Sequence, residues 1–159
     1  MKAAIIMGSI SDRPIADKAL GIFEKFGVET HLEVISAHRT PERAFEFAKN
    51  AESEGIEVII AIAGKAAHLG GVIAANTTIP VIGIPAKTSV MGGMDSLLSI
   101  VQMPKGIPVA TVAIDGGENA ALLAVSMLGL KYPNLKEKLA QYRVELAKQV
   151  DEMNKELDN

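Results

Sequence analysis

The chain has 159 residues, of which 48% are hydrophobic and 22% are charged, so it is long enough and apolar enough to form one globular domain. A formal net charge of -3 argues against a nucleic-acid partner, and the absence of cysteine excludes thiol chemistry and disulfides. No apolar run approaches the roughly 20 residues of a membrane span, and we therefore expect a soluble, cytoplasmic protein without membrane contact.

Five short apolar runs are expected to be strands, and because aromatic residues make up only 4% of the chain, the core should consist of Ile, Val, Leu, Ala and Met. Most of these runs lack polar alternation, which is typical of strands buried on both faces of a parallel sheet. The five predicted strands are Ala3–Met7, His31–Ile35, Val58–Ala63, Val81–Ile84 and Val109–Ile114. Segments with helical spacing separate them: Pro14–Phe26, Pro41–Glu54, Ala66–Ala75, Met94–Val101 and Glu118–Leu128. This alternation predicts an α/β fold, a three-layer doubly wound parallel sheet of the flavodoxin-like or Rossmann-like kind.

The last segment, residues 133–159, predicts one long C-terminal helix after an α/β domain of residues 1–132. Its apolar residues recur every three or four positions and form one stripe: Leu135, Leu139, Tyr142, Leu146, Val150, Met153 and Leu157. Such a stripe packs either on the helix's own domain or on a neighbouring subunit, and helix length does not separate the two.

The loop after the first strand has the residues of a phosphate cradle. Ligands of open α/β sheets bind beyond the carboxyl ends of the strands. Here Gly8 permits a tight turn, Ser9 and Ser11 offer hydroxyls, and the following helix offers free N–H groups. Asp12 can accept hydrogen bonds from a ribose. The alternative is that Ser11 and Asp12 only cap the helix, and the loop matches neither the Walker A nor the GxGxxG pattern.

The loop after the second strand brings together Ser36, His38 and Arg39. An imidazole titrates near neutral pH, so His38 can move a proton, and the guanidinium of Arg39 can bind a phosphate. The alternative is a surface histidine beside a solvated arginine, although the position at a strand end favours function.

The loop after the third strand contains small residues that let a ligand approach the backbone, and His68 either lines a pocket or satisfies a buried polar contact. His31 lies inside a strand beside Glu33 and is interpreted as structural. Three histidines without clustered acidic ligands give no metal signature. The residues alone therefore indicate a small phosphorylated ligand and do not determine the reaction.

Four ordered blocks carry a family resemblance. They are Met7-Gly8-Ser9-x-Ser11-Asp12, Ser36-Ala37-His38-Arg39-Thr40-Pro41, Ala66-Ala67-His68-Leu69, and the run from Asp95 to Pro104. With these blocks the chain resembles the class I PurE family, the N5-carboxyaminoimidazole ribonucleotide mutases of purine biosynthesis, over residues 3–130.

The resemblance implies a cofactor-free and metal-free transfer of a carboxylate within one molecule, from N5-carboxyaminoimidazole ribonucleotide to 4-carboxy-5-aminoimidazole ribonucleotide. By resemblance, His38 carries the proton that leaves the ring carbon. The substrate-binding positions would be Ser9, Ser11, Asp12, Ser36 and Arg39, and the wall of a carbon dioxide pocket would be Ala66, Ala67, His68 and Leu69. The family also implies a homo-octamer with sites at subunit contacts, which favours a tail helix that packs on a neighbour.

The chain departs from the family pattern near the third strand. Where the family has Ala-Gly-Gly-Ala-Ala-His-Leu-Pro-Gly-Met, Lys65 replaces the second glycine, Gly70 the proline and Val72 the methionine. A lysine there adds a positive charge near the carboxylate or fills space meant for carbon dioxide. Two alternatives therefore stay open: direct carboxylation of aminoimidazole ribonucleotide by carbon dioxide, and a non-catalytic nucleotide-binding module. Arg39 favours the class I reaction over the direct carboxylation.

Overall fold

The computed structural model describes residues 1–157, and within them five parallel strands form one sheet in the order β2-β1-β3-β4-β5. The strands are β1 (Lys2–Met7), β2 (Glu29–Val34), β3 (Ile56–Ala63), β4 (Val81–Pro85) and β5 (Ala110–Thr111). The α-helices are α1 (Arg13–Phe26), α2 (Pro41–Asn50), α3 (Leu69–Ala74), α4 (Met94–Val101), α5 (Gly117–Leu128) and α6 (Pro133–Leu157), with short 3-10 turns η1 (Ile10–Asp12) and η2 (Met91–Gly93). This strand order is flavodoxin-like, and it confirms the predicted doubly wound α/β class.

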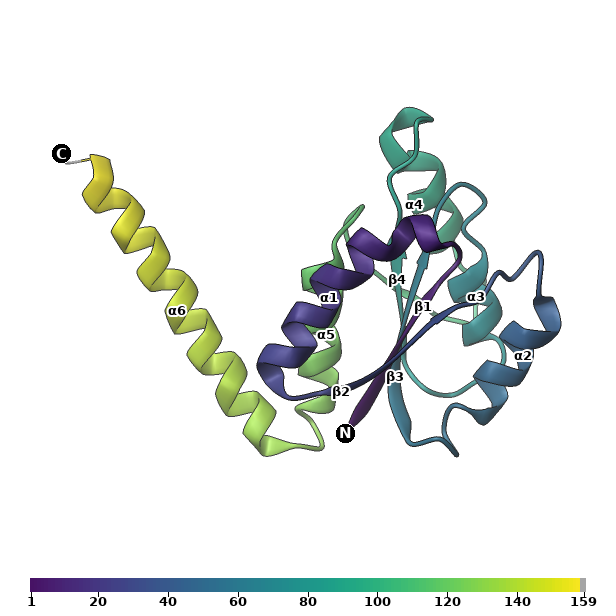
Figure 1. Ribbon diagram of the computed structural model, residues 1–159, viewed down its shortest axis with the longest axis horizontal. Coiled ribbons are helices and arrows are strands. Elements are labelled where there is room, and N and C mark those ends of the chain that lie inside the picture. The colour runs from purple at the N-terminus through teal and green to yellow at the C-terminus, as the bar shows by residue number, and fades with distance from the viewer. Residues whose placement is uncertain (158–159) are drawn as a thin grey trace.

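Helices cover both faces of the sheet, as Figure 1 shows. Ala3 and Ile5 of β1 pack with α1 and α5, whereas Ala4 and Ile6 pack with α2, α3 and α4, since successive strand residues point to opposite faces. Gly117 allows α5 to approach α1 closely, because a β-carbon there would collide with the carbonyl of Ile15. Both faces of the central strands are therefore buried, which explains their continuous apolar sequence.

The core contains aromatic side chains besides the expected Ile, Val, Leu, Ala and Met. Phe23 and Phe26 on α1 are among the largest fully buried side chains, although aromatic residues are rare in this chain. Two aromatic rings at helical spacing of three fill the space between α1 and the sheet, so a small number of aromatics is enough.

Three elements end or begin three or more residues away from the predicted bounds, and the others differ by at most two residues. The strand predicted over Val109–Ile114 is wrong in extent, because β5 keeps only two residues in register with β4 before the chain turns at Asp115, whose φ is +56°. The helix predicted over Ala66–Ala75 begins only at Leu69, since residues 65–68 form a tight loop instead. The helix predicted to reach Glu54 ends as α2 at Asn50, and turns follow it.

Only the first part of α6 packs on its own domain. Leu135 is fully buried, Leu139 and Tyr142 pack against the α1 face of the core, and Tyr142 meets Phe26 edge to face at 5.8 Å between ring centroids. Beyond that point the stripe is open: Val150 is 56% exposed and Met153 is 61% exposed. Figure 1 shows this part of α6 projecting away from the sheet. The last two residues of the predicted helix, 158–159, lie outside the described residues.

The chain from 1 to 157 contains no helix that is both long enough and apolar enough to cross a membrane. The longest one, α6, carries charged residues along its whole length.

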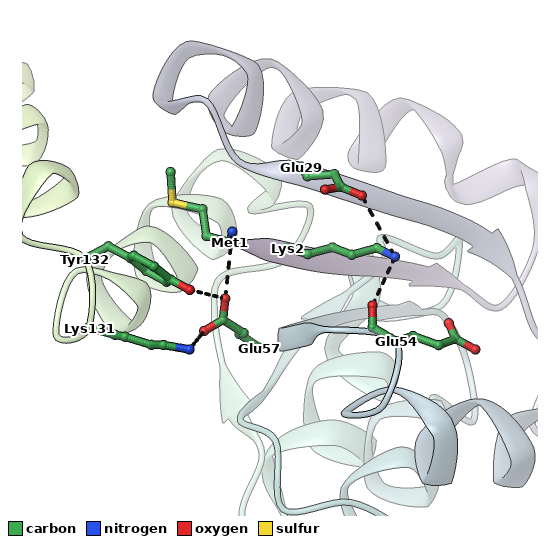
Figure 2. Close-up of polar contacts among 7 residues, drawn as sticks. All are labelled: Met1, Lys2, Glu29, Glu54, Glu57, Lys131 and Tyr132. Carbon is green, nitrogen blue, oxygen red and sulfur yellow. Dashed lines mark hydrogen bonds and ion pairs between the residues drawn. The ribbon is translucent and has the colours of Figure 1, made fainter.

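A carboxylate anchors the connection between α5 and α6 to the amino edge of the sheet (Figure 2). Glu57, at the start of β3, accepts a hydrogen bond from the Tyr132 hydroxyl at 2.8 Å and pairs with the Lys131 ammonium at 2.6 Å. The amino group of Met1 lies 4.0 Å from the same carboxylate. Partial burial alone would raise the pKa of Glu57, but the hydrogen bonds from Lys131 and Tyr132 outweigh it, and the net pKa is lowered.

Replacing Glu57 by glutamine is expected to lower the free energy of unfolding by about 1 kcal/mol at neutral pH, because the ion pair with Lys131 is lost. Since folding lowers the pKa of Glu57, its contribution is complete above the ordinary glutamate value of 4.5. It is lost as the pH falls through the lower folded-state pKa. Urea unfolding of both proteins at about pH 7 and about pH 3 measures the difference, which should be smaller in acid.

The matched control is Glu29→Gln. The Glu29 side chain is 72% exposed and lies 4.0 Å from Lys2, so its loss should cost little. Equal losses of stability in the two variants at neutral pH would contradict the anchoring role of Glu57.

Candidate active site

A cavity of about 610 Å³ lies at the carboxyl edge of the sheet, where the loops after β1, β2, β3 and β4 converge. In this topology the edge between β1 and β3 is the switch point at which the chain crosses to opposite faces, and ligands of such sheets bind there. The lining residues are Gly8, Ser9, Ser11, Asp12, Ser36, Ala37, His38, Arg39, Ala63, Gly64, Lys65, Ala66, His68, Leu69, Ala86, Lys87, Thr88 and Ser89.

A second hollow, of about 970 Å³, lies at the opposite, amino edge of the sheet. Its lining includes Lys49, Glu52 and Asn76 but no histidine, arginine or serine. The smaller cavity is therefore the better candidate for catalysis, because it gathers groups that can move protons and bind anions.

Ser9 and Asp12 form a capping box around the 3-10 turn η1, and Ser9, Ser11 and Asp12 all line the cavity. The Ser9 hydroxyl accepts a hydrogen bond from the Ser11 N–H at 3.3 Å, and the Asp12 carboxylate accepts one from the Ser9 N–H at 3.2 Å. The alternative that Ser11 and Asp12 only cap the long helix is therefore wrong: Ser9 caps the turn η1, and Asp12 stands at the start of α1 without a side-chain hydrogen bond to it. All three residues line the cavity. Burial raises the pKa of Asp12, and the charge of Asp115 adds to this against the opposing hydrogen bonds from Ser9 and Ser11.

Arg39 is fixed across the gap between two loops. Its guanidinium donates to the Ser36 hydroxyl at 3.2 Å and to the Gly8 carbonyl at 3.1 Å. The N–H of Arg39 also donates to the Ser36 hydroxyl, at 3.2 Å. A guanidinium held next to the Ser9 loop can bind an anion there without much loss of side-chain entropy.

Two histidines from different loops meet in the cavity. The Nε2 atom of His38 lies 3.1 Å from the Nδ1 atom of His68, and the rings meet edge to face. In this hydrogen bond one nitrogen carries the proton and the other accepts it, so the pair can hold a proton and pass it on. His31, in contrast, lies outside the cavity, where it pairs with Glu33 at 2.8 Å and stacks on Phe47.

The loop after β3 contributes Lys65, Ala66, His68 and Leu69 to the lining. Ala67 does not border the cavity: it is 1% exposed and belongs to the core on the α2 side of the sheet. The structure therefore brings all of the predicted site residues except Ala67 to one cavity.

Sequence reasoning missed the loop after β4, which adds Lys87, Thr88 and Ser89 to the lining. The signal was available, because these polar residues follow the predicted strand Val81–Ile84 after only Pro85 and Ala86. Asp115 accepts a hydrogen bond from the Lys87 N–H at 2.8 Å and fixes this loop.

The lining carries excess positive charge on a chain whose net charge is -3. The cavity lining contains three basic side chains, those of Arg39, Lys65 and Lys87, but only one carboxylate, that of Asp12. This local excess favours an anionic ligand. No group of three or more metal-binding side chains occurs among residues 1–157.

Comparison with known proteins identifies relatives over almost the whole chain. A family model described as AIR carboxylase matches residues 2–149. The N5-carboxyaminoimidazole ribonucleotide mutase of Pyrococcus horikoshii is 60% identical over 154 residues, which cover 97% of this chain and 87% of that protein. The mutase of Thermotoga maritima is 54% identical over 157 residues, covering 99% and 92%.

Two further matches are a relative with a different name and a solved structure of lower sequence identity. A protein of Vigna aconitifolia named phosphoribosylaminoimidazole carboxylase, chloroplastic, is 52% identical over 138 residues, which cover 87% of this chain but 25% of that protein. The crystal structure of Treponema denticola PurE superposes with a TM-score of 0.88 at 29% identity and covers 99% of both chains.

Replacing Asp12 by asparagine is expected to raise the melting temperature at neutral pH, because asparagine keeps an acceptor for the Ser9 N–H while removing a partly buried charge. Since folding raises the pKa of Asp12, the wild-type protein loses stability as the pH rises from the ordinary value of 3.8 through the folded-state pKa. The advantage of asparagine should therefore be absent below about pH 3.8 and grow as the pH rises. Thermal unfolding from about pH 3 to about pH 8 measures it.

Asp17→Asn serves as the control, since the Asp17 side chain is 54% exposed and pairs with Arg13 on the surface of α1. A lower melting temperature for Asp12→Asn at neutral pH would show that the hydrogen bonds outweigh the cost of burial, contrary to this expectation.

Proposed function

This chain belongs to the AIR carboxylase family, and from that premise we propose that its cavity converts N5-carboxyaminoimidazole ribonucleotide to 4-carboxy-5-aminoimidazole ribonucleotide in purine biosynthesis. The reaction is an isomerisation. The observation that carries the proposal is the hydrogen-bonded pair of His38 and His68 in a cavity rich in positive charge.

The ribose phosphate is proposed to bind on the β1 and β2 side of the cavity. Ser9 and Ser11 offer hydroxyls near the start of α1, and Arg39 is held beside them by Ser36. Asp12 can accept hydrogen bonds from the ribose hydroxyls. These five residues would fix the nucleotide so that its ring points toward the two histidines.

The chemical step moves one carboxyl group and one proton. The bond between the exocyclic nitrogen and the carboxyl carbon breaks and releases carbon dioxide, and ring carbon four then attacks it to form a new carbon–carbon bond. His38 donates a proton to the exocyclic nitrogen as carbon dioxide leaves, and its imidazole then takes up the proton that leaves ring carbon four. His38 recovers the proton that it gave. Substrate and product are isomers, so no oxidant or reductant is needed.

Carbon dioxide must stay beside the ring between these two events. Ala66, His68 and Leu69 would form the wall that retains it, with Ala67 packed behind them. Small side chains let the ring and the gas approach the backbone while water is displaced.

The key test compares two histidine variants. His38→Asn should lower kcat by about 10²–10⁴-fold, because the general acid–base group is lost, with little change in nucleotide affinity. His31→Asn removes a histidine outside the cavity and should change kcat less than about twofold. Turnover is followed as conversion of the carbamate substrate, and full activity of His38→Asn would refute the proton-transfer role.

The carboxylase name of the family model and of the Vigna relative motivates a second assay on the same protein. Aminoimidazole ribonucleotide and bicarbonate are supplied without ATP. The mutase reaction predicts efficient conversion of the carbamate and slow product formation in this assay. Efficient formation from bicarbonate would favour direct carboxylation, whereas binding without turnover in both assays would favour a nucleotide-binding module.

We further propose that residues 1–132 carry the chemistry and that the helix of residues 133–159 joins subunits of a homo-octamer. The exposed end of the α6 stripe supports this, and so does a second apolar patch beside the cavity, on the loop before α4 and on α4 itself: Val90, Met91, Met94, Leu98 and Val101. Apolar areas of this kind are normally covered in an assembly. We also propose a cytoplasmic location, which the charge of the nucleotide substrate supports, because such a molecule does not cross a membrane unaided.

Disrupting the α6 stripe should reduce the oligomeric mass. Leu146→Asp combined with Val150→Asp places two charges on the exposed apolar face, and burial of unpaired charges opposes association. Light scattering after gel filtration measures the mass. Lys148→Asp combined with Gln149→Asp, at exposed polar positions of the same turn, is the control, and an unchanged mass for the stripe variant would exclude this interface.

A further inference from the structure

Lys65 has a backbone conformation that lysine rarely adopts. Its φ is +58°, and among residues 1–157 only Met91 and Asp115 share a positive φ without being glycine. In this left-handed region the β-carbon of an L-residue crowds its own backbone, whereas glycine has no such conflict. The loop therefore keeps a lysine at a position where local backbone preference favours glycine.

The shape of the loop is imposed by α4 and not by the lysine side chain. The buried hydroxyl of Ser96 accepts the Lys65 N–H at 2.9 Å, and the Ser99 hydroxyl donates to the Lys65 carbonyl at 3.4 Å. Both contacts use only backbone atoms of Lys65, so a glycine could make them equally well. The reason for a lysine must lie in its side chain.

The ammonium group of Lys65 has no partner within the described chain. Lys25 and Lys131 form ion pairs with Glu145 and Glu57 at 2.8 and 2.6 Å, whereas no carboxylate or hydrogen-bond acceptor contacts the Lys65 side chain in residues 1–157. Lys65 is exposed and lines the cavity. An unpaired cation in a cavity wall is available to an anionic ligand.

The position of Lys65 in the cavity indicates which anionic group of the ligand it would bind. The phosphate side of the cavity already has Arg39, fixed to the Gly8 loop at 3.1 Å. Lys65 instead lies in the same tight loop as His68, whose ring contacts His38 at 3.1 Å. Under the proposed function the ring reacts beside His38 and His68, so Lys65 lies in the loop on that side of the cavity, and the anionic group that the ligand brings there is its migrating carboxylate.

We propose that Lys65 binds the migrating carboxylate and makes the site prefer carboxylated nucleotides over aminoimidazole ribonucleotide, which has the same phosphate but no carboxylate. This inference rests on the proposed function for its choice of ligands. Lys65 would be a specificity-determining residue, because a charge-assisted contact to one ligand is absent from the other.

The experiment measures binding by calorimetry, with 4-carboxy-5-aminoimidazole ribonucleotide and aminoimidazole ribonucleotide as separate ligands of the full chain. Lys65→Gly should weaken binding of the carboxylated nucleotide roughly tenfold and leave binding of the other within about twofold. Lys65→Met should behave like Lys65→Gly, since it also lacks the charge, and Lys65→Arg should retain most of the preference. The melting temperature of Lys65→Gly should be unchanged or higher, because the crowded backbone conformation is relieved.

Lys49→Met is the matched control, because Lys49 is an exposed lysine on α2 that lines the hollow at the other edge of the sheet. It changes net charge equally and should not alter the preference. Equal weakening of both ligands by Lys65→Gly, or no weakening of either, would overturn the proposal. Because binding is measured without turnover, a wild-type protein that prefers the carboxylated nucleotide through Lys65 but does not form it would refute only the mutase function.

Discussion

Parallel pairing of β1 with β3 is the constraint on which the site depends. The two strands run in register to Met7 and Ile62, and the ladder continues past their ends, with the Gly8 N–H bonded to the Ile62 carbonyl at 2.9 Å. On the other side of β3, the Ala86 N–H bonds to the Ala63 carbonyl at 2.8 Å. Because paired parallel strands end at the same edge of the sheet, the first residues of the loops that follow them lie side by side. The cavity floor is therefore held by the hydrogen bonds of the sheet.

The two edges of the sheet use charge in opposite ways. At the amino edge, Glu57 is satisfied by Lys131 and Tyr132, and this closed network stabilises the fold (Figure 2). At the carboxyl edge, Lys65 and Lys87 line the cavity with no carboxylate paired to them within residues 1–157, and Asp12 is partly desolvated. The partly buried charge of Asp12 lowers stability, which is the usual compromise between a stable fold and a binding site, whereas the exposed ammonium groups of Lys65 and Lys87 remain hydrated.

Backbone strain is concentrated at the same edge. Lys65 follows β3, Met91 precedes α4 and Asp115 follows β5, and these three are the only non-glycine residues with positive φ between residues 1 and 157. Each loop is held by contacts that override local preference: Ser96 fixes Lys65, and Asp115 in turn fixes Lys87. Such over-determined loops keep cavity-lining side chains in place before a ligand arrives.

The sequence by itself determined the α/β class and pointed to the loops where Ser9, His38 and Arg39 stand, because apolar periodicity and strand-end residues are local properties of the chain. It did not determine the contact between His38 and His68, since those rings are 30 positions apart and meet only when two crossovers pack on the same sheet face. The two-residue extent of β5, the position of Ala67 in the core and the outward direction of α6 were likewise decided by tertiary structure. Local propensity cannot encode such features, because each depends on which distant segment supplies the neighbouring atoms.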